Sequence, residues 1–166
     1  MNARFASRIL PLLLVVLGTA AGAANAAVRV NFIHPDRYTD MDRFSDEARS
    51  AMRAIEGDLV QLGKRYLPQD ADLRVDILDV DLAGRLRPSA IRGRDVRVDR
   101  GIADPPSIRL HYVLEQSGRV VREQEETVRG LAYTGTTDIN AANESFPYEK
   151  RMLTHWFRER FAQGAR

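Results

Sequence analysis

A strict alternation of apolar and polar residues constrains the fold of this 166-residue chain more than any other feature. Every second residue from Ile108 to Leu114 is apolar, so these side chains share one face of a strand. A turn signal at 116–118 follows, and residues 120–128 are expected to return antiparallel. Because the returning segment carries three glutamates, we expect it to form an edge or a solvated face of the sheet.

Two further segments have the pattern of strands. Residues 28–32 alternate, and they are expected to bury one face. In 73–82 the apolar positions change phase, which predicts either a bulge near Ile77–Leu78 or a strand buried on both faces. Residues 83–106 show little pattern apart from a short strand predicted at 96–98.

Two helices are predicted from apolar residues at steps of three and four. The first runs from about residue 43 to Tyr66, and the second begins at Pro147 with Ser145 as its cap. Three side chains are candidates to cap the first helix, namely Thr39, Asp40 and Asp42. We therefore predict an α+β fold for residues 27–166 as a single domain, in which two helices cover a small, mostly antiparallel sheet of three to five strands.

The first 26 residues have the pattern of a secretory signal peptide. Arg4 and Arg8 precede a short apolar stretch at 9–17, and a run of small residues ends in Ala-Asn-Ala at Ala26. We therefore expect cleavage between Ala26 and Ala27. The mature chain is then expected in the periplasm or outside the cell, with no membrane span left after processing.

Removal of this leader changes the charge balance. The full chain has 25 basic and 23 acidic residues, and the leader holds two of the basic ones, so the mature chain is formally neutral. Neutrality argues against a nucleic-acid partner. The chain contains no cysteine, which excludes disulfides and a thiol nucleophile.

Aspartates on the 73–82 strand are the first candidate site. Asp79 and Asp81 lie two positions apart and share a face, as paired carboxylates that hold Ca²⁺ would do. The alternative is a strand face that is solvated or paired with nearby arginines. The first interpretation would suit a small metal-dependent hydrolase, with His111 as a base if a nucleophile lay opposite.

Arginines between residues 85 and 100 are the second candidate site. Six arginines and two aspartates give this segment a net charge of +4. Guanidinium groups bind phosphate and carboxylate in bidentate fashion, so an anionic component of the cell envelope is a candidate partner. The alternative is a solvated loop that neutralises acidic strands nearby. The residues chosen as the anion-binding candidates are Arg92, Arg94 and Arg97.

Catalytic motifs are incomplete throughout the sequence. There is no G-x-S-x-G, Walker A or H-E-x-x-H pattern, and His155 with Glu159 has the spacing of a helix salt bridge. We therefore expect no catalytic residues and no cofactor. A non-enzymatic binding or interaction module is the favoured function, and the Asp79/Asp81 hydrolase is the alternative.

Four segments resemble an uncharacterised family of exported bacterial proteins, domain of unknown function 3016. The resemblance implies a signal peptide and one small domain, and it implies no activity. Where the family pattern leads us to expect Asp-Met-Asn-Tyr, this chain has Gly-Leu-Ala-Tyr at 130–133. The four segments are Phe32–Asp40, Val75–Gly84, Asp104–Tyr112 and Tyr148–Phe157.

Overall fold

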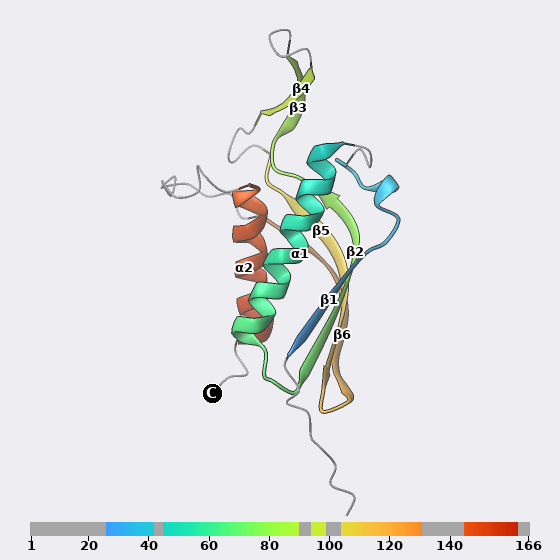
Figure 1. Ribbon diagram of the computed structural model, residues 1–166, viewed down its shortest axis with the longest axis vertical. Helices are drawn as coiled ribbons and strands as arrows, with labels where there is room; N and C mark the ends of the chain where they lie inside the picture. Colours follow the sequence, from blue (N-terminus) through green and yellow to red (C-terminus); the bar gives the residue numbers. More distant parts are fainter. Residues whose placement is uncertain (1–25, 42–44, 90–93, 99–103, 131–144, 163–166) are drawn as a thin grey trace, which may run out of the picture.

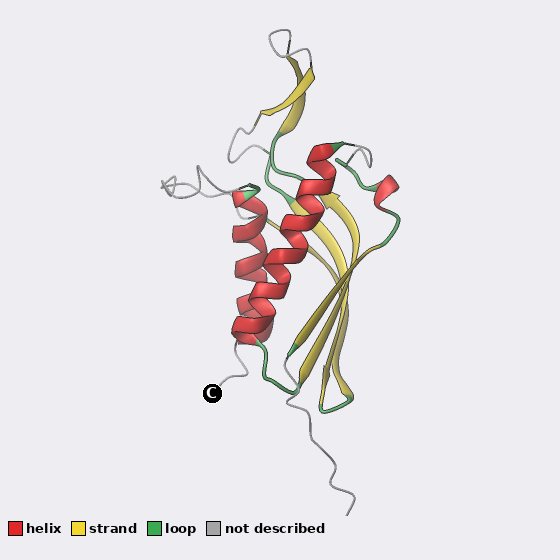
Figure 2. Ribbon diagram, in the orientation of Figure 1, coloured by secondary structure: helices red, strands yellow, loops and turns green. Residues whose placement is uncertain are grey.

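A four-stranded sheet with two helices on one face forms the body of the protein, as Figure 1 and Figure 2 show. The computed structural model describes residues 26–41, 45–89, 94–98, 104–130 and 145–162. The helices and strands are β1 (Ala27–Phe32), the short 3-10 helix η1 (Pro35–Arg37), α1 (Asp46–Tyr66), β2 (Ala71–Asp81), β3 (Arg85–Ser89), β4 (Arg94–Val98), β5 (Ser107–Gln116), β6 (Arg119–Arg129) and α2 (Pro147–Phe161).

The sheet has the strand order β1-β2-β5-β6. Strand β1 runs parallel to β2, whereas β2–β5 and β5–β6 are antiparallel. A parallel pair needs a crossover connection, and here η1 and α1 supply it. The predicted α+β fold, the mostly antiparallel sheet and the position of β6 at an edge are therefore confirmed.

Helix α1 begins later than predicted and packs closely on β1. Its N-cap is Ser45, whose Oγ accepts a hydrogen bond of 3.0 Å from the Ala48 N–H. The predicted caps Thr39 and Asp40 are wrong, because both lie in the segment that binds β2, and Asp42 lies outside the described residues.

Close packing of α1 on β1 depends on a glycine. A Cβ at Gly63 would overlap the side chain of Val28, so only glycine lets the two backbones approach this closely. The helix ends at Tyr66, as predicted.

Helix α2 begins at Pro147, as predicted, but its cap differs. Phe146 is the N-cap residue with a φ of 59°, and it makes no side-chain cap hydrogen bond, so the prediction of Ser145 is wrong. The third helical residue, Glu149, is 3% exposed, and its Oε1 accepts a 2.8 Å hydrogen bond from the Ala83 N–H. This contact ties the start of α2 to the segment that follows β2.

An aromatic cluster fills the space between α2 and the sheet. The rings of Tyr112 and Trp156 meet edge to face with centroids 5.8 Å apart, and those of Phe157 and Phe161 are 4.6 Å apart. The Trp156 Nε1–H donates to Glu126 of β6 at 2.9 Å, so the polar group of a buried ring is satisfied. The cluster therefore fixes α2 against both β5 and β6.

Two bulges interrupt the strand pairing. The register of β2 against β5 shifts between Ile77 and Asp79, which confirms the bulge predicted from the change of phase. A second shift follows Leu114, where the pairing of β6 passes from Arg122 to Val120 and leaves Val121 without a partner.

The strands β3 and β4 form a separate hairpin that projects beyond one end of the sheet (Figure 1). The sequence predicted a strand at 96–98, and the structure places β4 there, extended to Arg94–Val98. Strand β3 was not predicted; it has only five residues and includes Pro88, a residue that is depleted in strands because it lacks a backbone N–H. No helix within the described ranges is long and apolar enough to cross a membrane.

Candidate functional site

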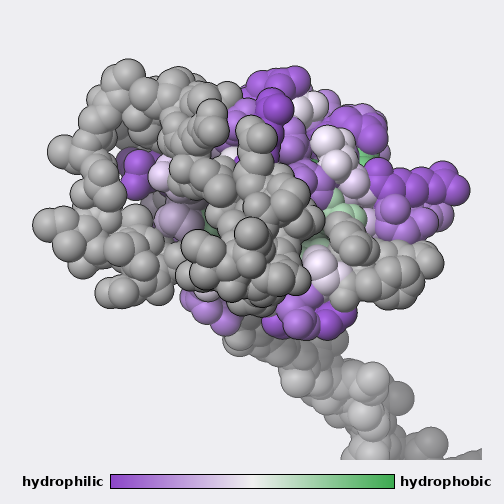
Figure 3. Space-filling view, turned by 90° about the horizontal axis from the view of Figure 1, so that it is seen from above, coloured by the Kyte–Doolittle hydropathy of each residue, from purple (hydrophilic) through white to green (hydrophobic). Residues whose placement is uncertain are grey.

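A polar cleft of about 600 Å³ lies at the end of the sheet from which the hairpin projects. The view from this end shows that much of the described surface is hydrophilic (Figure 3). The walls of the cleft come from the segment after η1, the end of β2, the start of β5 and the end of β6. The lining residues are Thr39, Asp40, Asp81, Leu82, Gly84, Arg85, Asp104, Pro105, Pro106, Ser107, Arg129 and Gly130.

One wall of the cleft is held on β2 by consecutive hydrogen bonds. The hydroxyl of Tyr38 donates to the Ile77 carbonyl at 2.8 Å, and burial raises the pKa of this tyrosine. The backbone N–H and the hydroxyl of Thr39 donate to the two carboxylate oxygens of Asp79, each at 2.7 Å. These bonds fix the 38–40 segment along the end of β2.

A second set of contacts at the cleft joins the two ends of the segment that contains the hairpin. The Arg85 Nε lies 3.1 Å from Asp104 Oδ1, and the Gly84 N–H donates to the Asp104 carbonyl at 3.1 Å. The Gly130 N–H donates to the Pro106 carbonyl at 2.8 Å, and a Cβ at Gly130 would lie 2.7 Å from Pro106 Cδ. An aspartate at position 130, as the family pattern leads us to expect, would therefore require Pro106 to move.

Charges of both signs line the cleft. Arg85 and Arg129 are exposed cations on its walls, whereas Asp81 and Asp104 are partly buried acids. Because Asp104 pairs with Arg85, a ligand in the cleft would meet this ion pair and the side chain of Arg129. The arrangement can bind a polar ligand that carries donor and acceptor groups.

The two predicted metal-site aspartates differ in their surroundings. Asp79 has both carboxylate oxygens bonded to Thr39, and Asp81 lines the cleft. Within the part of the chain that the structure describes, no group of three or more His, Cys, Asp or Glu side chains could hold a metal ion. The alternative hypothesis of a metal-dependent hydrolase therefore gains no support from this geometry.

The predicted anion-binding arginines belong to the hairpin. Arg94 lies opposite Ser89 in the register of β3 and β4, and Arg97 lies opposite Leu86. Arg92 lies outside the described residues. Anion binding by these three arginines stays a prediction.

A polar network that the sequence analysis missed covers the open face of the sheet. His111 Nε2 lies 3.0 Å from Glu123 Oε1, and its Nδ1 lies 3.7 Å from Asp76 Oδ2. Asp76 also accepts a 2.7 Å hydrogen bond from Asn31. The missing signal was the register, which places His111 directly opposite Asp76. On α2, His155 and Glu159 form the predicted pair at 3.5 Å.

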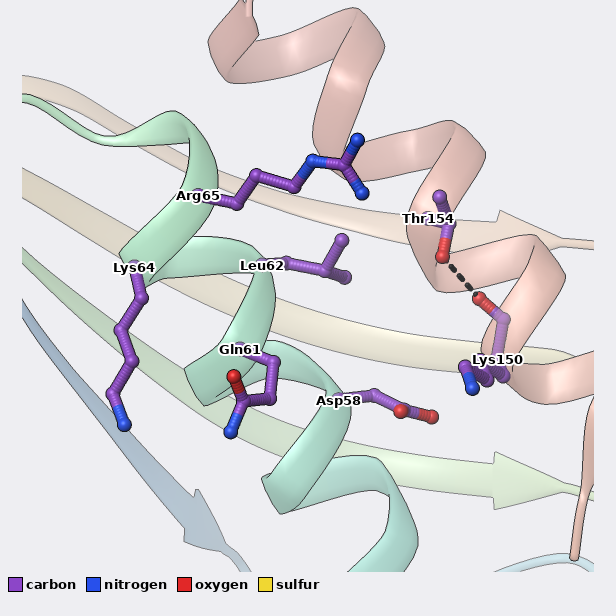
Figure 4. A pocket seen from close by; sticks show the side chains of 7 residues that line it. All are labelled: Asp58, Gln61, Leu62, Lys64, Arg65, Lys150 and Thr154. Carbon is purple, nitrogen blue, oxygen red and sulfur yellow. Dashed lines mark hydrogen bonds between the residues drawn. The ribbon is translucent and has the colours of Figure 1, made fainter. Parts of the chain in front are cut away.

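A smaller hollow of about 400 Å³ lies between the two helices (Figure 4). Helix α1 contributes most of its lining, and α2 contributes Lys150 and Thr154. The Thr154 hydroxyl donates to the Lys150 carbonyl at 2.7 Å, and Arg65 extends from α1 toward α2. The hollow is therefore a groove between helix surfaces with mixed polar and charged walls.

Fold and cleft together define the protein as a small α+β domain with a polar cleft and a projecting hairpin at one end of its sheet. The chain belongs to the family described as protein of unknown function (DUF3016), whose profile matches residues 26–159. Comparison with curated proteins finds no match.

Three of the four family-like segments meet at the cleft, and the fourth contacts the chain beside it. Three of them contribute lining residues, represented by Thr39, Asp81 and Asp104. The fourth contributes Glu149, whose carboxylate binds the Ala83 N–H beside the cleft. This convergence of distant segments marks the cleft end as the candidate functional end of the domain.

Proposed function

We propose that the mature chain is a non-enzymatic binding module of the bacterial cell envelope and that its arginine-rich hairpin binds an anionic partner. The observation that carries this proposal is the position of β3 and β4, which pair with each other and project from the body (Figure 1). Arginines that only neutralised the acidic strands would be expected to lie along the sheet.

Charge distribution supports the same function. The segment 85–100 has a net charge of +4, so the rest of a neutral mature chain has a net charge of −4. The two strands of this segment project at one end of the sheet, and Arg129 lies on the wall of the cleft at that end. A surface of this kind attracts polyanions and repels them elsewhere, which orients the encounter.

Arginine chemistry narrows the class of partner. Guanidinium forks bind phosphate and carboxylate groups in bidentate fashion, and both groups are repeated along anionic polymers of the cell envelope. We therefore propose a polymer or surface with repeated phosphate or carboxylate groups as the partner. The cleft at the base of the hairpin would receive a polar end or branch of such a partner.

The proposal places the module beyond the inner membrane. The family match begins at residue 26 and β1 begins at Ala27, so removal of residues 1–26 would leave every described helix and strand in place. Cleavage between Ala26 and Ala27 and residence in the periplasm or outside the cell form part of the proposal. Mass determination of the protein recovered from its host tests this part directly.

Binding to an anionic polymer tests the main part. The chain 27–166 is applied to a heparin matrix and eluted with salt, together with the triple variant Arg92→Ala, Arg94→Ala and Arg97→Ala. We expect the variant to elute at much lower salt. Each arginine that is removed takes away one contact with a charged group of the matrix and so weakens the part of the binding that depends on salt.

A matched control separates the hairpin from charge alone. The triple variant Arg53→Ala, Arg119→Ala and Arg158→Ala removes the same charge from exposed positions on α1, β6 and α2. It should elute close to the unchanged chain. Equal losses in both triple variants, or no retention of the unchanged chain at low salt, would contradict the proposal.

A further inference from the structure

We propose that a second cavity, at the opposite end of the sheet from the hairpin, binds a small anion with an apolar body. The cavity has a volume of about 550 Å³ and lies where α1 and α2 end and where β6 begins. The lining residues are Arg65, Tyr66, Leu67, Pro68, Ala71, Leu114, Gln116, Val121, Arg122, Arg160 and Phe161. This inference is independent of the hairpin and of the function proposed for it.

The floor of the cavity is apolar. Ala71 and Phe161 are 2% and 7% exposed, and both belong to the buried layer between the helices and the sheet. Leu67, Leu114 and Tyr66 are half-buried and pack against the same core. A hydrocarbon or ring placed here would cover apolar surface that water now contacts.

Three arginines surround this floor. Arg122 donates from Nη1 to the Arg160 carbonyl at 2.6 Å, and the Arg65 guanidinium lies 5.4 Å from the centre of the Tyr66 ring. Neither contact involves a carboxylate. Arg160 pairs with Glu126 at 2.9 Å. The lining therefore contains three guanidinium groups and no acidic side chain.

The bulge in β6 shapes the wall of the cavity. Consecutive residues of a regular strand point to opposite faces, yet Val121 and Arg122 both line the cavity. The register shift beside them accounts for this, because an extra residue in one strand re-aims its neighbours. As a result, an apolar and a cationic side chain stand next to each other at the cavity.

Val121 adds exposed apolar surface to the cavity wall. It is 54% exposed, and its neighbour Val120, which is 57% exposed, does not line the cavity. A ligand whose apolar body lies on Val121 and Phe161 would cover this surface, while its charged group reaches Arg122 or Arg65. Figure 4 shows Arg65 extending from α1 toward α2, and this residue lines both hollows.

These features define the chemistry of the ligand. It has one anionic group, carboxylate or phosphate, that guanidinium groups can bind through charge-assisted hydrogen bonds. It has an apolar body small enough for a cavity of about 550 Å³, a volume typical of small-molecule sites. A small amphipathic acid, with one such group on an apolar chain, fits both requirements.

Three probes with the same tail separate charge from apolar contact. Decanoate, decyl phosphate and decanol are titrated into the chain 27–166 by calorimetry, with the fluorescence of Trp156, the only tryptophan, as a second readout. Trp156 reports on the site because its indole bonds to Glu126, which pairs with the cavity residue Arg160. We expect at least one anion to bind with a dissociation constant below about 1 mM and decanol to bind at least tenfold more weakly.

Variants locate the binding in this cavity. Arg122→Gln should weaken binding of the anion about tenfold, whereas Arg119→Gln, on the same strand but outside the cavity, should leave it unchanged. Val121→Asp keeps every guanidinium group and adds a negative charge at the wall, so it should also weaken binding. The proposal is overturned if neither anion binds at about 1 mM, if decanol binds equally well, or if the two arginine variants behave alike.

Discussion

Stability of the fold should depend on pH through the contacts of Glu126. Its side chain is 14% exposed, and its carboxylate accepts hydrogen bonds from Trp156 at 2.9 Å and from Arg160 at 2.9 Å. Burial acts to raise the pKa of this carboxyl, but the hydrogen bonds from Arg160 and Trp156 outweigh burial and hold the pKa below its ordinary value of 4.5. The ionised form is therefore the one that the folded state stabilises.

Substitution Glu126→Gln keeps an acceptor for the Trp156 indole and removes the charge that Arg160 pairs with. Hydrogen bonds to charged groups contribute about 1.5–3 kcal/mol, but the Arg160 side chain is 38% exposed, so solvent screening reduces the expected loss to about 1 kcal/mol at pH 7. For a domain of this size the melting temperature should fall by about 4 °C.

The sign of the pH effect follows from the lowered pKa. Stability that Glu126 contributes is fully present above pH 4.5 and is lost as the pH falls through the lower pKa of the folded state. The difference in free energy of unfolding between the unchanged chain and Glu126→Gln should therefore decrease as the pH falls below 4.5. Urea unfolding followed by circular dichroism measures this difference.

A neighbouring glutamate provides the control. Glu125 pairs with Arg109 at 3.2 Å, and both side chains are about half exposed, so Glu125→Gln should cost less than about 0.5 kcal/mol. A gap for Glu126→Gln that stays constant down to about pH 3, or equal losses in the two variants, would refute the reasoning.

Three other outcomes are expected. Gly63→Ala should destabilise the fold by about 1–3 kcal/mol because the added methyl group overlaps Val28, whereas Gly57→Ala, which meets open space, should stabilise it by about 0.5–1 kcal/mol; urea unfolding measures both. Glu149→Ala should cost about 1–3 kcal/mol in the same assay by leaving a backbone N–H unpaired, and Glu149→Gln should cost less because an acceptor remains. Millimolar Ca²⁺ should leave the melting temperature unchanged, since among the described residues no group of three or more candidate ligands gathers around Asp79; a rise would restore the metal-site hypothesis.

Local patterns in the sequence were sufficient for the body of the fold. Alternation over 108–114 predicts which face of β5 is buried. The change of phase in β2 predicts a bulge or a strand buried on both faces, and the structure has the bulge, between Ile77 and Asp79. Both predictions succeed because the side-chain period of a strand is two, so an apolar residue out of phase needs a structural cause. The end of α1 at Tyr66 was predictable for a similar reason, since Pro68 cannot continue a helix.

Non-local features could not be predicted in this way. The cleft combines Thr39, Asp81, Asp104 and Arg129, which are far apart in the sequence and meet only through strand order. The helix caps were mispredicted. Several residues before α1 can accept a backbone N–H, and Ser45 is the one that does, whereas the N-cap residue of α2 is Phe146, which makes no side-chain cap hydrogen bond. Asp79 looked like a metal ligand because the sequence does not show that Thr39 binds it.

The length of the strands has a geometric consequence. Strand β2 has eleven residues, which at about 3.3 Å per residue spans about 35 Å. The hairpin and the arginine-lined cavity lie at opposite ends of this span, so the two proposed sites are separated by about the length of the sheet. The sheet would then keep the two ligands, a large charged surface and a small amphipathic molecule, at a constant distance from each other. No conformational change of the protein would be needed for this.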